Sequence, residues 1–123
     1  MKMLVSINPE HVAKILSGDK KYEYRTKAAK RNPGSMVIYE TAPVKKVVAE
    51  AEILEIIGLP PEELWEKTKS QSGISREFFD SYFRGREIAY AYRLGEVTAY
   101  DAPMELGSYG IESAPQSFAY LND

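Results

Sequence analysis

The chain contains no cysteine and only one histidine among its 123 residues. Without cysteine it has no disulfide framework and no thiol chemistry. A structural zinc site is not expected either, because such sites are built from Cys and His ligands. We therefore expect no metal ion and no cofactor, and the single histidine, His11, is interpreted as a residue on the surface of a helix.

Glycine-rich phosphate loops and long apolar runs are also missing from the sequence. Without a G-x-G-x-x-G or Walker A pattern, a nucleotide-dependent motor or dehydrogenase is not indicated. No nucleophile elbow or Ser/His/Asp set is visible. No apolar run approaches the length of a membrane span, and the apolar start is too short for a signal peptide. We expect a cytoplasmic protein, with residues 1–123 forming a single domain.

Charge is unevenly distributed along the chain, although the formal net charge is only −2. Residues 1–46 carry a balance of +6 and residues 47–123 a balance of −8. A local basic patch on a mildly acidic protein is typical of a surface that binds a polyanion. The alternative is that the acidic half of the chain neutralises the patch in space. The basic residues concentrate at Lys20, Lys21, Arg25, Lys27, Lys30 and Arg31.

The order of predicted elements favours a mixed α+β fold. A strand at 2–7 precedes a helix that starts at Pro9 and ends at Gly18, a residue suited to a helix C-terminus. Further strands are predicted at 22–25, 35–40, 45–57, 88–94 and 118–121, with helices starting near Pro61 and Ser75. In the long strand the alternation breaks near Leu54, which indicates a bulge or bend. Mixed strands with few helices argue against a doubly wound parallel sheet. The helix after Ser75 carries Phe78, Phe79, Tyr82 and Phe83, which are expected in the core.

The most informative segment runs from Gly18 to Arg25 and joins the first helix to the second strand. Alternation along a strand would place Lys21, Glu23 and Arg25 on one face, and Lys20 with two tyrosines on the other. Ionisable groups in line suit an anion site or a proton-transfer site. The alternative is a solvated face with surface ion pairs of little energetic worth.

This segment fits the pattern G-x-K-x-x-E-x-R and resembles the ASCH family (activating signal cointegrator homology domain), a relative of the PUA RNA-binding fold. The residues that match are Gly18, Lys20, Glu23 and Arg25. The resemblance extends over segments 6–10, 39–45, 73–79 and 115–118, and so through almost all of the chain. It implies a PUA-like small curled β-barrel flanked by short helices.

The resemblance also implies a cleft between the first helix and the barrel that binds RNA or a nucleotide. Basic residues would contact phosphates, and Tyr22, Tyr24 or Tyr39 could stack on an unpaired base of single-stranded or looped RNA if its ring faces out. The alternative, which we favour for two of these three tyrosines, is that they pack in the barrel. We expect Lys20, Glu23 and Arg25 to share one pocket. Lys45 or the turn at 41–43 would form its opposite wall. The candidate binding residues are Lys20, Lys21, Glu23, Arg25, Lys27, Lys30, Arg31, Tyr39 and Lys45.

An alternative hypothesis is a small hydrolase acting on RNA or on a modified nucleoside. Some relatives resemble amidohydrolases of N4-acetylcytidine, which use the motif lysine, a threonine three residues on and a distant glutamate. Here Lys20 matches, Glu23 stands in the place of the threonine, and segment 69–72 has no carboxylate. In an enzyme the catalytic residues would be Lys20 and Glu23, with Glu23 as the base and Lys20 or Arg25 stabilising an anion.

Overall fold

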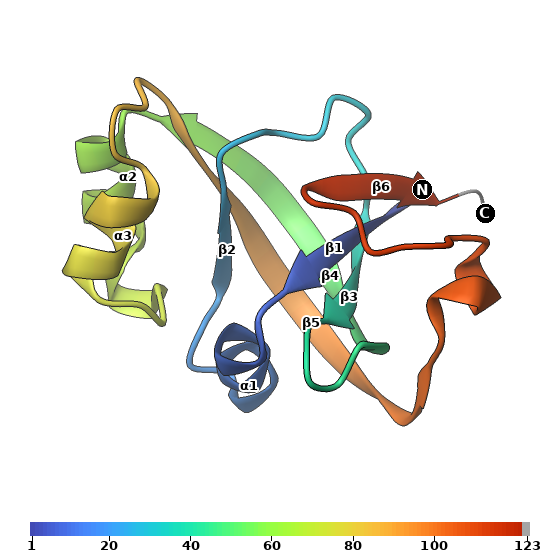
Figure 1. The fold of residues 1–123 in the computed structure, drawn as a ribbon. Coiled ribbons are helices and arrows are strands. Elements are labelled where there is room, and N and C mark those ends of the chain that lie inside the picture. The colour runs from blue at the N-terminus through green and yellow to red at the C-terminus, as the bar shows by residue number, and fades with distance from the viewer. Residues whose placement is uncertain (122–123) are drawn as a thin grey trace.

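The computed structural model describes residues 1–121 as one six-stranded sheet curled into a half-barrel, with short helices around it (Figure 1). The strand order is β2-β5-β4-β3-β1-β6, and β1 and β3 are its parallel pair. This confirms the predicted mixed α+β class. The elements are β1 Lys2–Ile7, α1 Pro9–Ser17, β2 Tyr22–Arg25, β3 Ser35–Glu40, β4 Lys46–Leu59, α2 Pro61–Thr68, η1 Lys69–Gln71, α3 Arg76–Tyr82, β5 Ala89–Met104, η2 Leu106–Tyr109 and β6 Phe118–Leu121.

The long antiparallel strands β4 and β5 carry the curvature of the sheet. Their register shifts between Ala51 and Ile53 and again between Ile53 and Glu55, where the sequence predicts a bulge. Gly95 lies inside β5 at the first shift, and a side chain there would overlap Glu52. The predicted strand at 88–94 is therefore too short, because β5 continues past this bulge to Met104.

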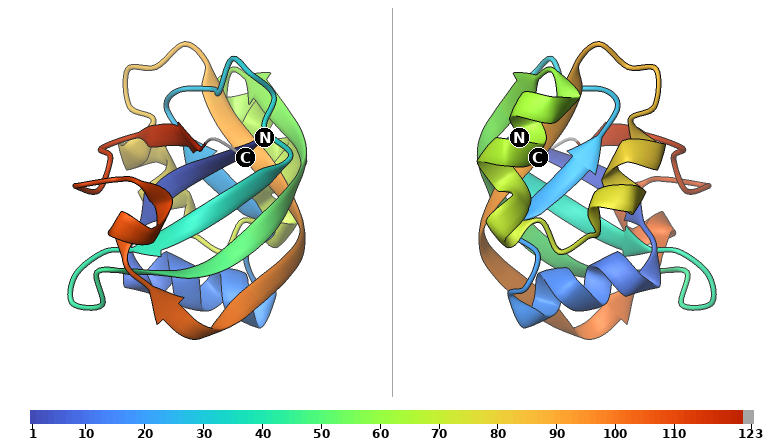
Figure 2. Two further views of the ribbon diagram at one scale, coloured as in Figure 1. Left: turned by 90° about the vertical axis from the view of Figure 1, so that its right-hand side faces the viewer. Right: turned by 90° about the vertical axis from the view of Figure 1, so that its left-hand side faces the viewer.

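The helices occupy different sides of the barrel. Figure 2 shows α1 lying across one end of the barrel, while α2 and α3 flank the curled sheet. Helix α1 ends at Gly18 with φ of 88°, as predicted, and Ser75 caps α3 by accepting a hydrogen bond from the Phe78 N–H. None of the described helices is long and apolar enough to cross a membrane.

The buried apolar side chains form three clusters, and two of them hold the barrel and the helical layer together. Inside the barrel, Tyr92 is fully buried among aliphatic residues and its hydroxyl accepts a hydrogen bond from the Ala29 N–H at 2.8 Å. Between the sheet and the helices, Tyr24 packs edge-on against Phe79 and Phe83. Strand β2 therefore has its tyrosines in the helical layer, and its intervening residues turn toward α1 and β1.

Arg25 joins the two open edges of the sheet. It lies on edge strand β2, and its Nη1 donates to the Ser6 carbonyl of β1 at 3.3 Å. Its Nη2 donates to the carbonyl of Ser117, next to the other edge strand β6, at 2.9 Å. Because no hydrogen-bond ladder joins β2 to β1 within residues 1–121, this side chain supplies a polar connection across the gap.

We expect Arg25→Met to lower the free energy of unfolding by about 3 kcal/mol, because it removes these bonds and leaves the buried Glu23 carboxylate unpaired. Urea unfolding at pH 7 measures the change. Arg93→Met is the matched control, since Arg93 pairs with Glu55 on an exposed face and should cost less than about 1 kcal/mol. Equal effects of the two substitutions would contradict the role of Arg25.

Candidate functional site

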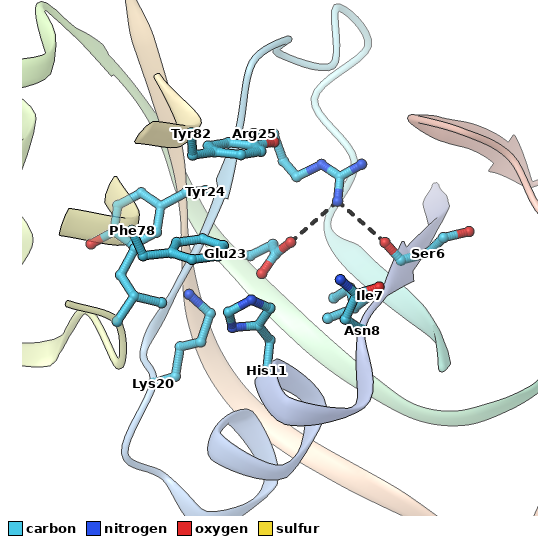
Figure 3. Close-up of a pocket in the computed structure, with 11 residues that line it drawn as sticks. Ser6, Ile7, Asn8, His11, Lys20, Glu23, Tyr24, Arg25, Phe78 and Tyr82 are labelled. Atoms are coloured by element: carbon cyan, nitrogen blue, oxygen red, sulfur yellow. Dashed lines mark hydrogen bonds and ion pairs between the residues drawn. The ribbon is translucent and has the colours of Figure 1, made fainter. Parts of the chain in front are cut away.

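A pocket of about 120 Å³ lies where the end of β1, the start of α1, strand β2 and helix α3 meet (Figure 3). At ~30 Å³ per water, this volume holds about four waters or one ring-sized group. The motif strand forms one wall, and the facing walls come from α1 and α3. The lining residues are Ser6, Ile7, Asn8, His11, Lys20, Glu23, Tyr24, Arg25, Ile74, Phe78 and Tyr82.

Lys20 enters the pocket from the turn that follows α1. Only 3% of the residue is exposed, and its Nζ donates to the Ser72 carbonyl at 3.2 Å and lies 4.7 Å from the centre of the Tyr24 ring. Gly73 makes this position possible, because a Cβ there would lie 2.5 Å from Lys20 Cβ. The φ of 68° at Gly73 also disfavours any residue with a side chain.

Burial lowers the pKa of Lys20 below its usual 10.5. The negative charge of Glu23 opposes this shift, and the positive charge of Lys14 adds to it. A charged Lys20 is thus held where solvent compensates it poorly, which costs folding free energy and makes an anion a favourable partner.

Glu23 and Arg25 form a shielded ion pair beside Lys20. Glu23 is 6% exposed, and its Oε2 lies 3.3 Å from Arg25 Nη1 (Figure 3). Since Arg25 also donates to two backbone carbonyls, its guanidinium is largely occupied by the protein itself. Lys20 is therefore the cation of the pocket with the greater freedom to bind an anion.

His11 is not the helix-surface residue that the sequence analysis expects. Its side chain is only 15% exposed and lines the pocket, packing edge-on against Phe78 at 5.2 Å. Burial and the charge of Lys20 lower the pKa of His11, so the imidazole is neutral at pH 7. Its buried Nδ1 has no hydrogen-bond partner among the described residues.

Two exposed aromatic rings stand at the entrance of the pocket. Phe78 and Tyr82 are 43% and 38% exposed, and their rings stack at 6.3 Å with an angle of 10°. The expectation that the four aromatic residues after Ser75 belong to the core is therefore wrong for these two, while Phe79 in α3 and Phe83 just after it are buried. One turn of helix separates the two exposed rings, so α3 presents one aromatic face to the core and another to the pocket.

Lys20, Glu23 and Arg25, which we expected together, do share this pocket. The residues expected on its opposite wall do not line it. Lys45 lines a separate hollow with Glu105 and residues of η2. The turn at 41–43 stays outside the pocket. Thr41 supports it indirectly by donating to Asn8 Oδ1 at 2.9 Å, so Asn8 stands at the start of α1 without capping the helix through its side chain.

The remaining predicted binding residues lie elsewhere. Tyr39 is 7% exposed and packs in the core with Val37 and Leu121, so its ring cannot stack on a base in this structure. Tyr22 is also buried. Lys21 is exposed, in a hollow on the other side of the turn after α1.

Lys27, Lys30 and Arg31 lie in the loop between β2 and β3, outside the pocket. The loop is fixed by the Tyr120 hydroxyl, which accepts from the Lys30 N–H at 2.8 Å. No cluster of three or more metal-binding side chains was found in residues 1–121.

Residues 5–100 match the ASCH domain family. The chain belongs to the ASCH family. Its structure is similar to the crystal structure of ASCH from Zymomonas mobilis, with a TM-score of 0.89 and 27% sequence identity over 98% of this chain and 87% of that one. A mutant of the same Zymomonas protein, in which a tyrosine is replaced by phenylalanine, superposes equally well. Its TM-score is 0.89 at 26% identity, covering 98% of this chain and 90% of that one.

Two longer proteins contain related sequence. An ASCH domain-containing ribonuclease of Zymomonas mobilis is 30% identical over 92 residues, which are 74% of this chain and 62% of that protein. The large ribosomal subunit protein uL22 of Ureaplasma parvum is 31% identical over 86 residues, which are 70% of this chain and 28% of that protein. The chain thus spans less than two thirds of these relatives.

We expect Lys20→Met to be at least as stable as the wild type at pH 7, because it removes a charge whose burial is unfavourable. A lowered folded pKa means that the unfolded chain binds more protons between that pKa and 10.5, so the cost of Lys20 is full below this window and fades as pH rises through it. Urea unfolding at pH 7 and pH 10 should show the advantage of the variant shrinking.

Lys27→Met is the control for this comparison, since the Lys27 side chain is exposed and has no ion pair within the described part of the chain. If the stability gained by Lys20→Met grew with pH, the lowered pKa of Lys20 would be contradicted.

Proposed function

We propose that this ASCH domain binds single-stranded RNA, with a base at the rim of the pocket and a phosphate near Lys20. The observation that carries the proposal is one buried, poorly compensated ammonium group beside two exposed aromatic rings. Phe78 and Tyr82 offer a face on which a base can stack, and Lys20 offers the charge for its phosphate. A base stacked on these rings at the rim must be unpaired, which favours a single strand over a duplex.

The distribution of charge supports a polyanionic ligand. The N-terminal part of the chain, residues 1–46, supplies the motif strand and the basic loop that follows it, and carries a balance of +6. An excess of positive charge on the strand and loop beside the pocket would raise the local concentration of a polyanion and accelerate its association. The Zymomonas relative named a ribonuclease is consistent with RNA as the ligand of this family.

A second candidate function is hydrolysis of RNA or of a modified nucleoside, and one observation favours it. The pocket gathers a buried carboxylate, a lysine of lowered pKa and the neutral imidazole of His11. Groups shifted by burial beside a charged partner are typical of acid–base sites. Here Glu23 would be the general base and Lys20 would stabilise the developing anion, and His11 adds a second proton acceptor.

Anisotropy of a labelled single-stranded RNA should show binding that weakens as salt rises, because each neutralised phosphate releases counterions. We expect Lys20→Met to weaken binding at least about tenfold, the value of one charge-assisted contact of ~1.5 kcal/mol. Lys67→Met, which removes an exposed lysine of α2, is the matched control and should bind as the wild type does.

Glu23→Gln separates the two candidate functions. The amide keeps an acceptor for Arg25 but removes a negative charge, so RNA binding should persist or strengthen. If the domain is a hydrolase, the same variant should lose turnover while it still binds. Wild-type protein that binds no RNA at any salt concentration, and releases no product from RNA or acetylated cytidine, would refute both candidates.

A further inference from the structure

A second hollow lies under the loop between β2 and β3. Figure 1 shows this loop at the end of the barrel opposite α1. Its volume is about 530 Å³, within the usual range for ligand sites. One side is the basic loop, with Lys27 and Lys30. The other side consists of three half-buried aromatic residues from strands distant in sequence, Tyr90, Phe118 and Tyr120.

Charge distinguishes this hollow from two others on the surface. No acidic residue lines it, and its charged groups are the ammonium groups of Lys27 and Lys30. The hollow at η2 contains Glu105 and Glu112. The one along β4 and β5 contains three glutamates and no cation. The hollow under the loop therefore suits a ligand that carries both an apolar ring and negative charge.

The backbone of the loop is held against the barrel, while the side chains of Lys27 and Lys30 stay exposed and can bind a ligand. Backbone N–H groups of Ala29 and Lys30 donate to the hydroxyls of Tyr92 and Tyr120, each at 2.8 Å, which fixes the loop against the barrel. Arg31 lies over the Tyr120 ring at 5.1 Å and so occupies part of that ring. Lys27 and Lys30 have exposed side chains without an ion pair among residues 1–121.

The aromatic residues are held in defined positions. Phe118 and Tyr120 pack edge to face at 5.3 Å and contact the barrel core. Tyr90 pairs with Arg25 across the β2–β5 ladder, and its ring lies so close to Gly58 that a Cβ there would be 2.8 Å from it. Rings fixed in this way lose little entropy when a base stacks on them.

Consecutive residues at the end of β2 line the two hollows. Arg25 lines the first pocket, Thr26 and Lys27 line the second, and Tyr90 stands opposite Arg25. We propose that the hollow under the loop is a second subsite, which takes another base of the same RNA strand with its phosphates on Lys27 and Lys30. This inference rests on the proposed function, and it makes binding depend on strand length.

The test compares uridine 5′-monophosphate with oligouridylates of two, four and eight nucleotides, by calorimetry with the RNA checked for integrity. Wild-type affinity should rise at least about tenfold from the shortest to the longest ligand. Tyr90→Leu should weaken binding of the octamer at least about fivefold, the low end for loss of one stacked base, and leave the mononucleotide unchanged. Tyr90→Phe keeps the ring and should bind the octamer as the wild type does.

The charge arm uses Lys27→Gln/Lys30→Gln, which should lower the salt slope for the octamer by about 1.4, at ~0.7 per lost phosphate contact. Lys67→Gln/Lys69→Gln removes two lysines that line neither hollow and should leave the slope unchanged. This arm decides the question if Tyr90→Leu does not fold.

Wild-type protein that binds no oligouridylate would refute the proposed function and the subsite with it. Length-dependent binding that requires Lys20 but is unaffected by Tyr90→Leu and by Lys27→Gln/Lys30→Gln would overturn the second subsite alone. Equal losses for mononucleotide and octamer in Tyr90→Leu would also overturn it, because the ring would then act on the first pocket.

Discussion

The open half-barrel depends on a polar connection between its two edges, and Arg25 provides it. A curled sheet that does not close leaves unpaired backbone groups along both edges, which are costly when buried. One guanidinium reaches the carbonyl of Ser6 in β1 and that of Ser117 next to β6, and within residues 1–121 the hydrogen-bond ladder joins neither strand directly to β2. Glu23 balances its charge. The same ion pair also lines the pocket. The contacts that connect the two edges of the half-barrel therefore also build the site.

Lys20 shows the opposite balance between stability and site chemistry. Its charge is buried at a cost that the single carbonyl of Ser72 and the Tyr24 ring do not offset, since the net effect on its pKa is downward. Such a cost is common at ligand sites, because a bound anion supplies the favourable electrostatic interaction that the buried ammonium group no longer has with water. The rest of the fold therefore supplies the stability that keeps this cation in place.

Local sequence rules predicted the framework of the site but not all of its walls. Gly18 ends α1 and the motif strand follows because glycine at a helix end and alternation in a strand are local signals. His11 and Tyr82 escaped prediction because their role depends on which side of a helix meets the sheet. Tyr39 lies on β3, whose central residues are buried on both faces, so alternation alone could not show whether its ring reaches solvent. Alternation separates two faces of a strand, but only packing decides which face is buried.

Lys20 comes from the segment that joins α1 to β2, but the surface that encloses its side chain comes from another part of the chain. Ser72 and Gly73 come from the helical excursion between β4 and β5, whose close approach to Lys20 tolerates no side chain at Gly73. The excursion also supplies both rings at the entrance of the pocket. The motif segment and the helical excursion thus meet where Lys20 packs directly against the backbone of Gly73. Substitutions confined to residues 60–88 can change the shape of the pocket around Lys20 while the barrel and Lys20 itself stay the same. Ligand preference can therefore diverge through this excursion without a change of fold.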